Sequence, residues 1–261
     1  MDIREKARKD RNEGFGLGLT PDPVITISEW SDQFAMLPKR SSAEPGRYRT
    51  NRMPYMKEIM DCLSVSSSVE QVKFMKGTQL GATTGGVNWF GYCVHLCPAP
   101  MMVVLPTVDM ANRHSKQKIA PTIEETPVLR ERIREAKSRD SGNTTLVKEF
   151  VGGMIMLVGA NSGASFRNVS IKNLHLSDVD GYPPDTEDEG DPCGLAKNRT
   201  DAFGNRKIYI ESTPTNKGSS RIEQEYEDSD QRKFYVPCPH CHEKQVLMWS
   251  GIIFEHDKYK L

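Results

Sequence analysis

The sequence predicts an α/β protein with a mostly parallel sheet and helices on both of its faces. Short apolar stretches of strand composition alternate with longer stretches of helical pattern between residues 69 and 210. A glycine-containing turn at residues 76–81 joins the first of these strands to a helix. The composition, 37% hydrophobic and 27% charged, is that of a globular protein. Because parallel strands need long crossover connections, which are usually helices, this alternation indicates a parallel sheet.

The expected elements follow from apolar spacing along the chain. Short runs of β-branched and apolar residues indicate strands, and apolar side chains at helical spacing indicate helices. Pro121 is expected to split one helical region in two, because proline lacks the N–H that a helix interior needs. Gly152 and Gly153 predict a hairpin. The expected helices cover residues 55–63, 83–96, 108–119 and 122–136, and the expected strands cover 69–75, 101–105, 145–150, 154–158, 171–176 and 207–210.

Charge and apolar runs exclude some classes of protein. There are 35 basic and 35 acidic residues, so net charge gives no support for nucleic-acid binding, although a local basic face stays compatible with it. No apolar run reaches the roughly 18–20 residues of a membrane helix, and the charged N-terminus does not fit a secretory signal. The cysteines outside one close pair show no disulfide framework, which indicates a reducing compartment.

Residues 76–84 lie where a phosphate-binding loop belongs, between a strand and a helix. Backbone N–H groups at a helix N-terminus attract an anion, and glycine lets the backbone approach it. The loop departs twice from the pattern G-x-x-x-x-G-K-[ST], because Lys76 replaces its first glycine and Ala82 replaces its lysine. Lys76 can still reach phosphates from the other side of the loop, and the Thr83 hydroxyl can bind Mg²⁺. Taken alone, the loop also fits an ordinary strand-to-helix turn. The residues expected to hold phosphate are Lys76, Gly77, Thr78, Gln79, Leu80, Gly81, Ala82, Thr83 and Thr84.

Cys238 and Cys241 have the spacing of a zinc knuckle. Two thiolates on one turn can fill two corners of a tetrahedral site, which needs four ligands. His240 and His242 lie too close to Cys241 to complete a relaxed site, and His256 is the remaining candidate downstream. A pair of thiols without metal fits the sequence as well as half of a zinc ribbon does. Our working interpretation is the half ribbon.

From about Trp30 to its end, the chain resembles the lambda-type (GpA) large terminase family. Matching stretches occur in the same order along the chain, which is far more specific than one loop. They are RYRTNRMPY from Arg47, KGTQLGATTG from Lys76, VVLPTVDMAN from Val103, KIAPTIEETP from Lys118, LSDVDGYPPDTEDEGDP from Leu176, ESTPTNKGSSRIEQEY from Glu211 and FYVPCPHC from Phe234.

The resemblance implies a RecA-like P-loop ATPase fold with a short N-terminal arm. It implies a motor in the host cytoplasm that uses ATP and Mg²⁺ to move double-stranded DNA into a procapsid. The implied partners are the small terminase subunit, the procapsid portal and further copies of the chain. The family also places its loop lysine at the position of Lys76, which makes that departure an expected one.

The resemblance assigns roles to an acidic motif, Ser177-Asp178-Val179-Asp180. A P-loop ATPase needs one carboxylate to hold Mg²⁺ and a second to orient the attacking water. The family usually has Asp-Glu here, so Ser177 takes the place of the Asp and Asp178 that of the Glu. We expect Asp178 to serve both metal and water, Asp180 to supply a second carboxylate, and Lys76 to join them in catalysis. Hydrolysis is expected to be slow, because Ser177 offers only a neutral oxygen. A solvated acidic loop is the alternative.

A second family element, Ser212-Thr213-Pro214, follows the strand 207–210. In the family it couples hydrolysis to motion near the γ-phosphate, because a hydroxyl can gain or lose a hydrogen bond to phosphate. Ser212 and Thr213 are therefore expected to be coupling residues. Without the family, a strand ended by a proline turn fits equally well.

Residues 1–40 are polar and rich in turn formers and are expected to form an N-terminal arm. The resemblance then implies an ATPase motor domain at 41–236 and the start of a truncated zinc ribbon or linker at 237–261. The nuclease domain of the family has no counterpart, so no DNA cleavage is expected. Two alternatives stand beside the motor: a prophage remnant that binds nucleotide or assembles but hydrolyses ATP poorly, and a zinc-containing interaction module. ATP turnover separates the first alternative from a motor, and metal analysis tests the second.

Overall fold

The computed structural model describes residues 22–133 and 143–248, together with residues 5, 6, 8, 9, 11, 251, 253–255 and 258–260. Within these residues the centre of the molecule is one six-stranded sheet. The first five strands in its spatial order run parallel, and the last pairs antiparallel at one edge. The expected mostly parallel sheet is thus confirmed. In spatial order the strands are β3 (Gln71–Met75), β8 (Lys207–Ser212), β7 (Asn173–Ser177), β4 (Met101–Leu105), β6 (Gly153–Gly159) and β5 (Val147–Phe150).

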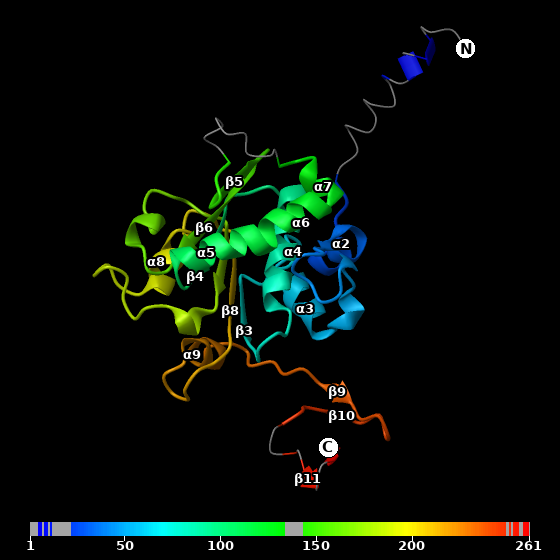
Figure 1. Cartoon of the computed structure of the whole chain (residues 1–261), viewed down its shortest axis with the longest axis vertical. Helices are drawn as coiled ribbons and strands as arrows, with labels where there is room; N and C mark the ends of the chain where they lie inside the picture. Colours follow the sequence, from blue (N-terminus) through cyan, green and yellow to red (C-terminus); the bar gives the residue numbers. More distant parts are fainter. Residues whose placement is uncertain are drawn as a thin grey trace.

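Helices cover both faces of this sheet, as expected (Figure 1). Alternate residues of β4 face opposite ways, so Met101 and Val103 belong to one apolar cluster and Met102 and Val104 to the other. The first cluster is covered by α2 (Ile27–Phe34), α3 (Tyr55–Cys62), α4 (Ala82–Leu96), α5 (Val108–His114), α6 (Ala120–Glu125) and α7 (Pro127–Arg130). The second is covered by η3 (Gly163–Phe166), η4 (Val179–Gly181), α8 (Pro192–Asn198) and α9 (Arg221–Glu227).

The helix α4 is the best buried of these, because its glycines let neighbouring elements approach closely. A Cβ at Gly91 would lie 2.4 Å from the Trp30 ring, and a Cβ at Gly86 would lie 2.3 Å from the His175 ring. Trp30 belongs to α2 and His175 to β7. The glycines therefore set how closely α4 packs between α2 and the sheet, and so where the loop before α4 lies.

Pro121 does not split the helical region, in contrast to the sequence prediction. A π-helical turn, η2 (Ser115–Ile119), joins α5 to α6, and Pro121 sits in the first turn of α6. The wider turn explains how the chain continues, because it relaxes the hydrogen-bond ladder that proline would otherwise break. The helix ends instead at Glu125, and its cap residue Thr126, just before Pro127, has an extended backbone. The predicted helical residues 134–136 lie outside the described part.

Two strands also extend past their predicted ends. The strand expected at 171–176 is β7, which reaches Ser177, and the strand expected at 207–210 is β8, which reaches Ser212. Glu211 is therefore a buried strand residue in place of a residue of the following turn. The expected hairpin is present, with β5 and β6 joined through Gly152 at a φ of 86°.

Part of the expected N-terminal arm packs into the core, because α2 (Ile27–Phe34) contributes buried residues to it. Thr26 caps α2 and exchanges hydrogen bonds with Glu29 in a capping box. The Trp30 side chain is 1% exposed, and its Nε1–H donates a 3.0 Å hydrogen bond to Nδ1 of His95 on α4. A small sheet of β1 (Met36–Leu37) and β2 (Gly46–Arg47) follows, so the contacts run across residue 40.

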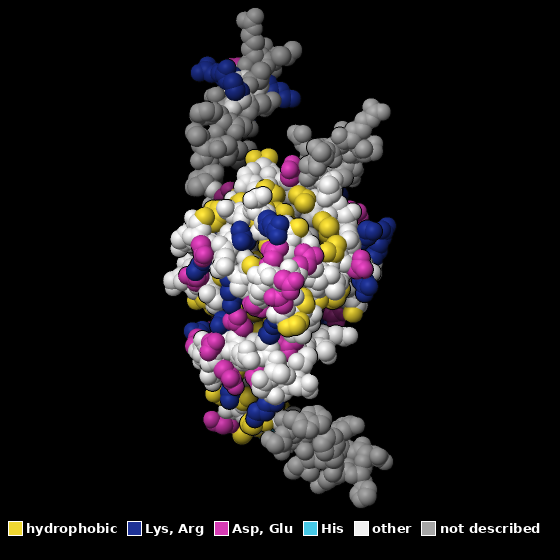
Figure 2. All heavy atoms as spheres, turned by 90° about the vertical axis from the view of Figure 1, so that its left-hand side faces the viewer, with side chains coloured by type: hydrophobic (Ala, Val, Ile, Leu, Met, Phe, Trp, Pro, Cys, Tyr) yellow, Lys and Arg dark blue, Asp and Glu magenta, His cyan; other side chains and the backbone are white. Residues whose placement is uncertain are grey.

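Charged side chains of both signs are interspersed over the face that Figure 2 shows, on the side of the molecule where α8 lies. This agrees with the zero formal net charge of the whole chain. No helix among the described residues is long and apolar enough to cross a membrane.

Candidate functional site

The expected phosphate loop leaves β3 and enters α4 at the carboxyl edge of the sheet. Gly81 caps the helix with a φ of 75°, and Gln79 also has a positive φ, of 59°. Residues 77–80 are exposed, whereas Thr83 and Thr84 at the start of α4 are half-buried. The first N–H groups of a helix have no partner within it, so the start of this 15-residue helix offers donors to an anion.

Lys76 bends back from the loop towards two carboxylates. Its Nζ lies 3.2 Å from Oε2 of Glu211 and 3.7 Å from Oδ1 of Asp178, and its side chain is only 9% exposed. Lys76 follows β3, Asp178 follows β7, and Glu211 is the second-last residue of β8. These three strands are neighbours in the sheet order. The structure thus brings Lys76 and Asp178 together, as expected, and adds Glu211, which the sequence analysis did not assign.

Glu211 is fully buried between β7 and the loop. It is the register partner of Ser177, whose Oγ donates a 2.6 Å hydrogen bond to Oε1. The His175 Nε2 atom lies 3.6 Å from the same oxygen. Burial alone raises the pKa of the Glu211 carboxyl, but His175, the Lys76 ammonium and the Ser177 hydroxyl outweigh it, and the pKa falls below its ordinary value. The carboxylate is therefore ionised at neutral pH.

Asp178 follows β7 in a left-handed conformation, with φ 55° and ψ 52°. Its side chain is 47% exposed, and its N–H donates a 2.8 Å hydrogen bond to the Glu211 carbonyl. Partial burial and the neighbouring Glu211 charge raise the pKa of the Asp178 carboxyl, against the Lys76 ammonium. A non-glycine residue in this conformation is uncommon, and here it follows the end of the strand beside the loop lysine.

Asp180 lies apart from this group and anchors the chain after β8. Its Oδ1 accepts the N–H of Ile222 at 2.9 Å, and its Oδ2 accepts the N–H and Oγ1–H of Thr215 at 2.8 and 2.9 Å. Burial acts to raise the pKa of Asp180, but these hydrogen bonds and one from Ser220 lower it overall. Both oxygens are engaged away from Lys76, so the structure does not bring Asp180 to the loop as the sequence analysis expected.

The two expected coupling residues lie between the loop and this anchor. The Ser212 carbonyl accepts the N–H of Lys76 at 3.1 Å, and the Ser212 hydroxyl accepts the N–H of Asp180 at 3.2 Å. Thr213 is half-buried, and its carbonyl accepts a 3.2 Å hydrogen bond from the Ser212 hydroxyl. A displacement of Ser212 would therefore reach both the loop lysine and the start of α9.

Comparison with known proteins shows the family of the chain. The family described as phage terminase large subunit gpA, ATPase domain, matches residues 42–260. The chain belongs to this family.

The gpA-family chain is also similar to individual relatives. It is 29% identical over 234 residues to the terminase large subunit of Enterobacteria phage P21, and 27% identical over 232 residues to that of Escherichia phage lambda. These matches cover 89% and 88% of this chain but 36% of each relative. The fold is similar to the crystal structure of the bacteriophage HK97 large terminase, with a TM-score of 0.60 at 12% identity, over 78% of this chain and 41% of that one.

In this gpA-family chain, Cys238 and Cys241 lie in the turn between β9 (Val236–Pro237) and β10 (Lys244–Gln245). The Cys238 N–H donates to the Glu243 carbonyl at 2.8 Å, and the His242 N–H donates to the Cys238 carbonyl at 2.9 Å. Backbone N–H groups of Cys241 and His240 lower the pKa of the Cys238 thiol, which favours a thiolate. His256 lies outside the described residues. The described part contains no group of three or more His, Cys, Asp and Glu side chains that could hold a metal ion.

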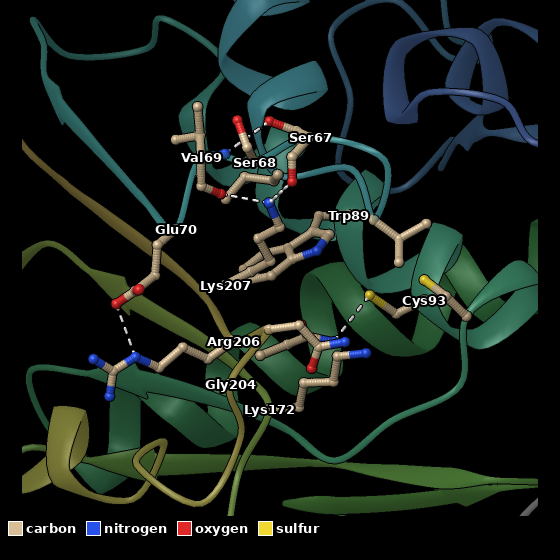
Figure 3. Close-up of a pocket in the computed structure, with 15 residues that line it drawn as sticks. Ser67, Ser68, Val69, Glu70, Trp89, Cys93, Lys172, Gly204, Arg206 and Lys207 are labelled. Atoms are coloured by element: carbon tan, nitrogen blue, oxygen red, sulfur yellow. Dashed lines mark hydrogen bonds and ion pairs between the residues drawn. The ribbon is translucent and has the colours of Figure 1, made fainter.

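A cavity of about 230 Å³ lies at the opposite, amino-terminal edge of the sheet (Figure 3). Its wall includes Glu70, Lys172 and Lys207, which precede or begin β3, β7 and β8. The Lys207 ammonium donates to the carbonyls of Ser67, at 2.7 Å, and of Val69. This cation ties the loop before β3 to β8. The cavity and the phosphate loop thus lie at opposite ends of the parallel strands.

Proposed function

We propose that the chain binds ATP at residues 76–84 and hydrolyses it as the ATPase part of a DNA-packaging motor. The contact between Lys76 and two carboxylates, that of Asp178 after β7 and that of Glu211 in β8, carries this proposal, because a phosphate loop, a loop lysine and carboxylates meet at the carboxyl edge of a parallel sheet. Membership of the gpA ATPase-domain family supports the same assignment.

Each part of the loop has a role in this proposal. The N–H groups of residues 77–84 hold the phosphates, and Lys76 leaves its carboxylates to pair with the β- and γ-phosphates. Mg²⁺, held by the Thr83 hydroxyl and Asp178, would neutralise phosphate charge in the bound state. Such an ion takes most of its ligands from phosphate and water and needs only one or two carboxylates. Asp178 also orients the attacking water.

The remaining contacts suggest how binding is transmitted. Ser212 and Thr213 act as coupling residues, because Ser212 bonds to the Lys76 backbone on one side and to Asp180 on the other. Asp180 serves in this scheme as the anchor of α9 and of Thr215, in place of a catalytic carboxylate. A shift of Lys76 on phosphate binding would then reach α9 through three hydrogen bonds, the last of them between Asp180 and Ile222.

The wider role extends beyond the part of the relatives that this chain matches. We propose double-stranded DNA as the substrate that is moved, the small terminase subunit and the procapsid portal as partners, a homo-oligomer as the active form and the host cytoplasm as the location. We also propose residues 41–236 as the motor domain and Cys238 with Cys241 as half of a zinc site in the segment 237–261.

The first experiment tests the loop lysine. Lys76→Ala should weaken ATP binding or lower turnover by at least about tenfold, because a lysine paired with phosphate makes charge-assisted bonds worth about 1.5–3 kcal/mol. Binding is measured with a fluorescent ATP analogue, and turnover by phosphate release with and without DNA. Lys57→Ala is the matched control, since the Lys57 side chain is 63% exposed on α3 and faces no carboxylate of the site. Equal binding and turnover in Lys76→Ala and parent would contradict the assignment.

A further inference from the structure

We propose that Glu211 replaces, from the neighbouring strand, the acidic side chain that Ser177 lacks, and that Glu211 and Asp178 together hold the metal ion of the bound nucleotide. This inference rests on the proposed function and deepens it. The acidic pair of the site would then be one residue from β8 and one from the end of β7, instead of two adjacent residues on one strand.

The register of the sheet places the two positions side by side. Ser177 and Glu211 are Cα partners in the parallel pair β7–β8, and strands in such a pair lie about 4.8 Å apart. The 2.6 Å hydrogen bond between Ser177 Oγ and Glu211 Oε1 shows that the glutamate reaches the space beside position 177. The Glu211 carboxylate thus lies in the space that the carboxylate of an acidic residue at position 177 would fill.

The second oxygen of Glu211 has only the Lys76 ammonium as a partner among the described residues. Its Oε2 atom is buried and makes no hydrogen bond among the described residues, although the Lys76 ammonium lies 3.2 Å away. A buried carboxylate oxygen normally accepts a hydrogen bond or binds a cation, because leaving it without either is costly. Once Lys76 has moved to phosphate, this oxygen beside the loop is suited to a metal ion or to its bound water.

The charges around Glu211 leave room for a further cation. One ammonium, that of Lys76, faces the two carboxylates of Glu211 and Asp178. When Lys76 moves to phosphate, both carboxylates lose this partner at the same time. A divalent ion that arrives with the nucleotide would restore the balance of charge, since both carboxylates face the ammonium that leaves.

A structural role for Glu211 is the competing explanation. In that case the glutamate only holds Lys76 and Ser177 in place, and its loss affects nucleotide affinity equally with and without metal. The metal role instead affects affinity only when a divalent ion is present. The dependence of binding on metal therefore separates the two roles.

The test compares nucleotide affinity in Mg²⁺ and in EDTA for the full chain and for Glu211→Gln. We expect the ratio of the two affinities to fall about tenfold or more in Glu211→Gln, because a carboxylate bond to a cation is lost, while affinity in EDTA does not fall. Mn²⁺ binding in the presence of a non-hydrolysable ATP analogue, followed by electron paramagnetic resonance, should weaken in parallel. Glu225→Gln is the matched control, since Glu225 is an ion-paired, largely buried glutamate on α9 that contacts Lys73 and Lys197.

A rescue completes the test. Ser177→Asp combined with Glu211→Gln should restore the metal dependence, because the carboxylate returns on the adjacent strand in the same register. If Glu211→Gln melts below the assay temperature, Glu211→Asp keeps the charge for Lys76 but shortens the reach, and should also reduce the ratio. An unchanged ratio in a folded Glu211 variant, or equal losses in Mg²⁺ and EDTA without rescue, would overturn the inference and leave the proposed function standing. A parent chain that binds no nucleotide in either condition would overturn both.

Discussion

At the scale of single residues, the site differs from the sequence interpretation mainly through Glu211. Ser177 was expected to leave the site short of charge and hydrolysis slow, with Asp180 as the compensating carboxylate. In the structure the Asp180 carboxylate accepts hydrogen bonds from Thr215 and Ile222. Glu211 instead contacts both Ser177 and Lys76. With Glu211 in the proposed metal role, the ground for expecting slow hydrolysis, and for a remnant that only binds nucleotide, is removed.

His114, at the end of α5, gives a prediction about pH at the same scale. Burial lowers the pKa of His114 from 6.5 to about 4, and nearby His175 and Lys118 act in the same direction. Between these pH values the unfolded chain binds a proton that the folded chain does not, so stability falls as the pH falls through this window. From pH 7 to pH 5 the loss from this one group is about 2 kcal/mol.

The measurement is the free energy of unfolding in urea at pH 7 and pH 5, for the parent and for His114→Gln. The variant should lose less stability than the parent over this interval, by about the amount that His114 contributes. Identical losses in the two proteins would show that His114 titrates as an ordinary histidine in the folded chain.

At the scale of elements, α4 decides where the phosphate loop lies. The helix begins at the loop and packs on β7 through Gly86, beneath the His175 ring that stacks on Tyr209 at a centroid distance of 4.8 Å. The same ring lies near Glu211. The position of α4 is thus connected to the carboxylate of the site through one buried imidazole.

Gly86→Ala tests this packing. The added Cβ would lie 2.3 Å from the His175 ring, so α4 or the ring must move, and the change should cost about 1–3 kcal/mol of stability. Thermal and urea unfolding measure this loss, and nucleotide affinity should fall with it as His175 shifts beside Glu211. Gly204→Ala is the control, because a Cβ there meets no atom within 4 Å. A Gly86→Ala protein as stable as Gly204→Ala would mean that the close packing of α4 on β7 is not present in solution.

At the scale of the whole molecule, the carboxyl and amino ends of the parallel strands carry different groups. The carboxyl edge carries the loop lysine and the carboxylates, and the amino edge carries the cavity and the Lys207 tether. The segment that contains α2 packs against α4, on the face of the sheet opposite to α8 and α9. A boundary at residue 40 therefore cuts through packed structure, although residues 41–236 remain our proposal for the motor domain.

Trp30→Ala tests whether α2 belongs to the body. Trp30 is almost fully buried against α4 and donates a hydrogen bond to His95, so its removal should cost about 3–5 kcal/mol of stability. Urea unfolding followed by circular dichroism measures the effect. Val24→Ala, at a position that is 87% exposed, should leave stability nearly unchanged. A loss below about 1 kcal/mol in Trp30→Ala would instead mean that the segment behaves as an arm.

The sequence by itself determined the α/β class, the mostly parallel sheet and the strand-to-helix turn at residues 76–81, and the family resemblance added the expected roles of Lys76 and Asp178. The class and the elements follow from local apolar periodicity, which needs no knowledge of distant contacts. Only the tertiary structure decided the role of Glu211, of Asp180 and of Trp30. Glu211 lies just past the predicted strand 207–210 and before Pro214, so the sequence indicated a turn residue there. Its partners Ser177 and Lys76 lie far from it along the chain. The pairing of β8 with β7 on one side and with β3 on the other brings them together.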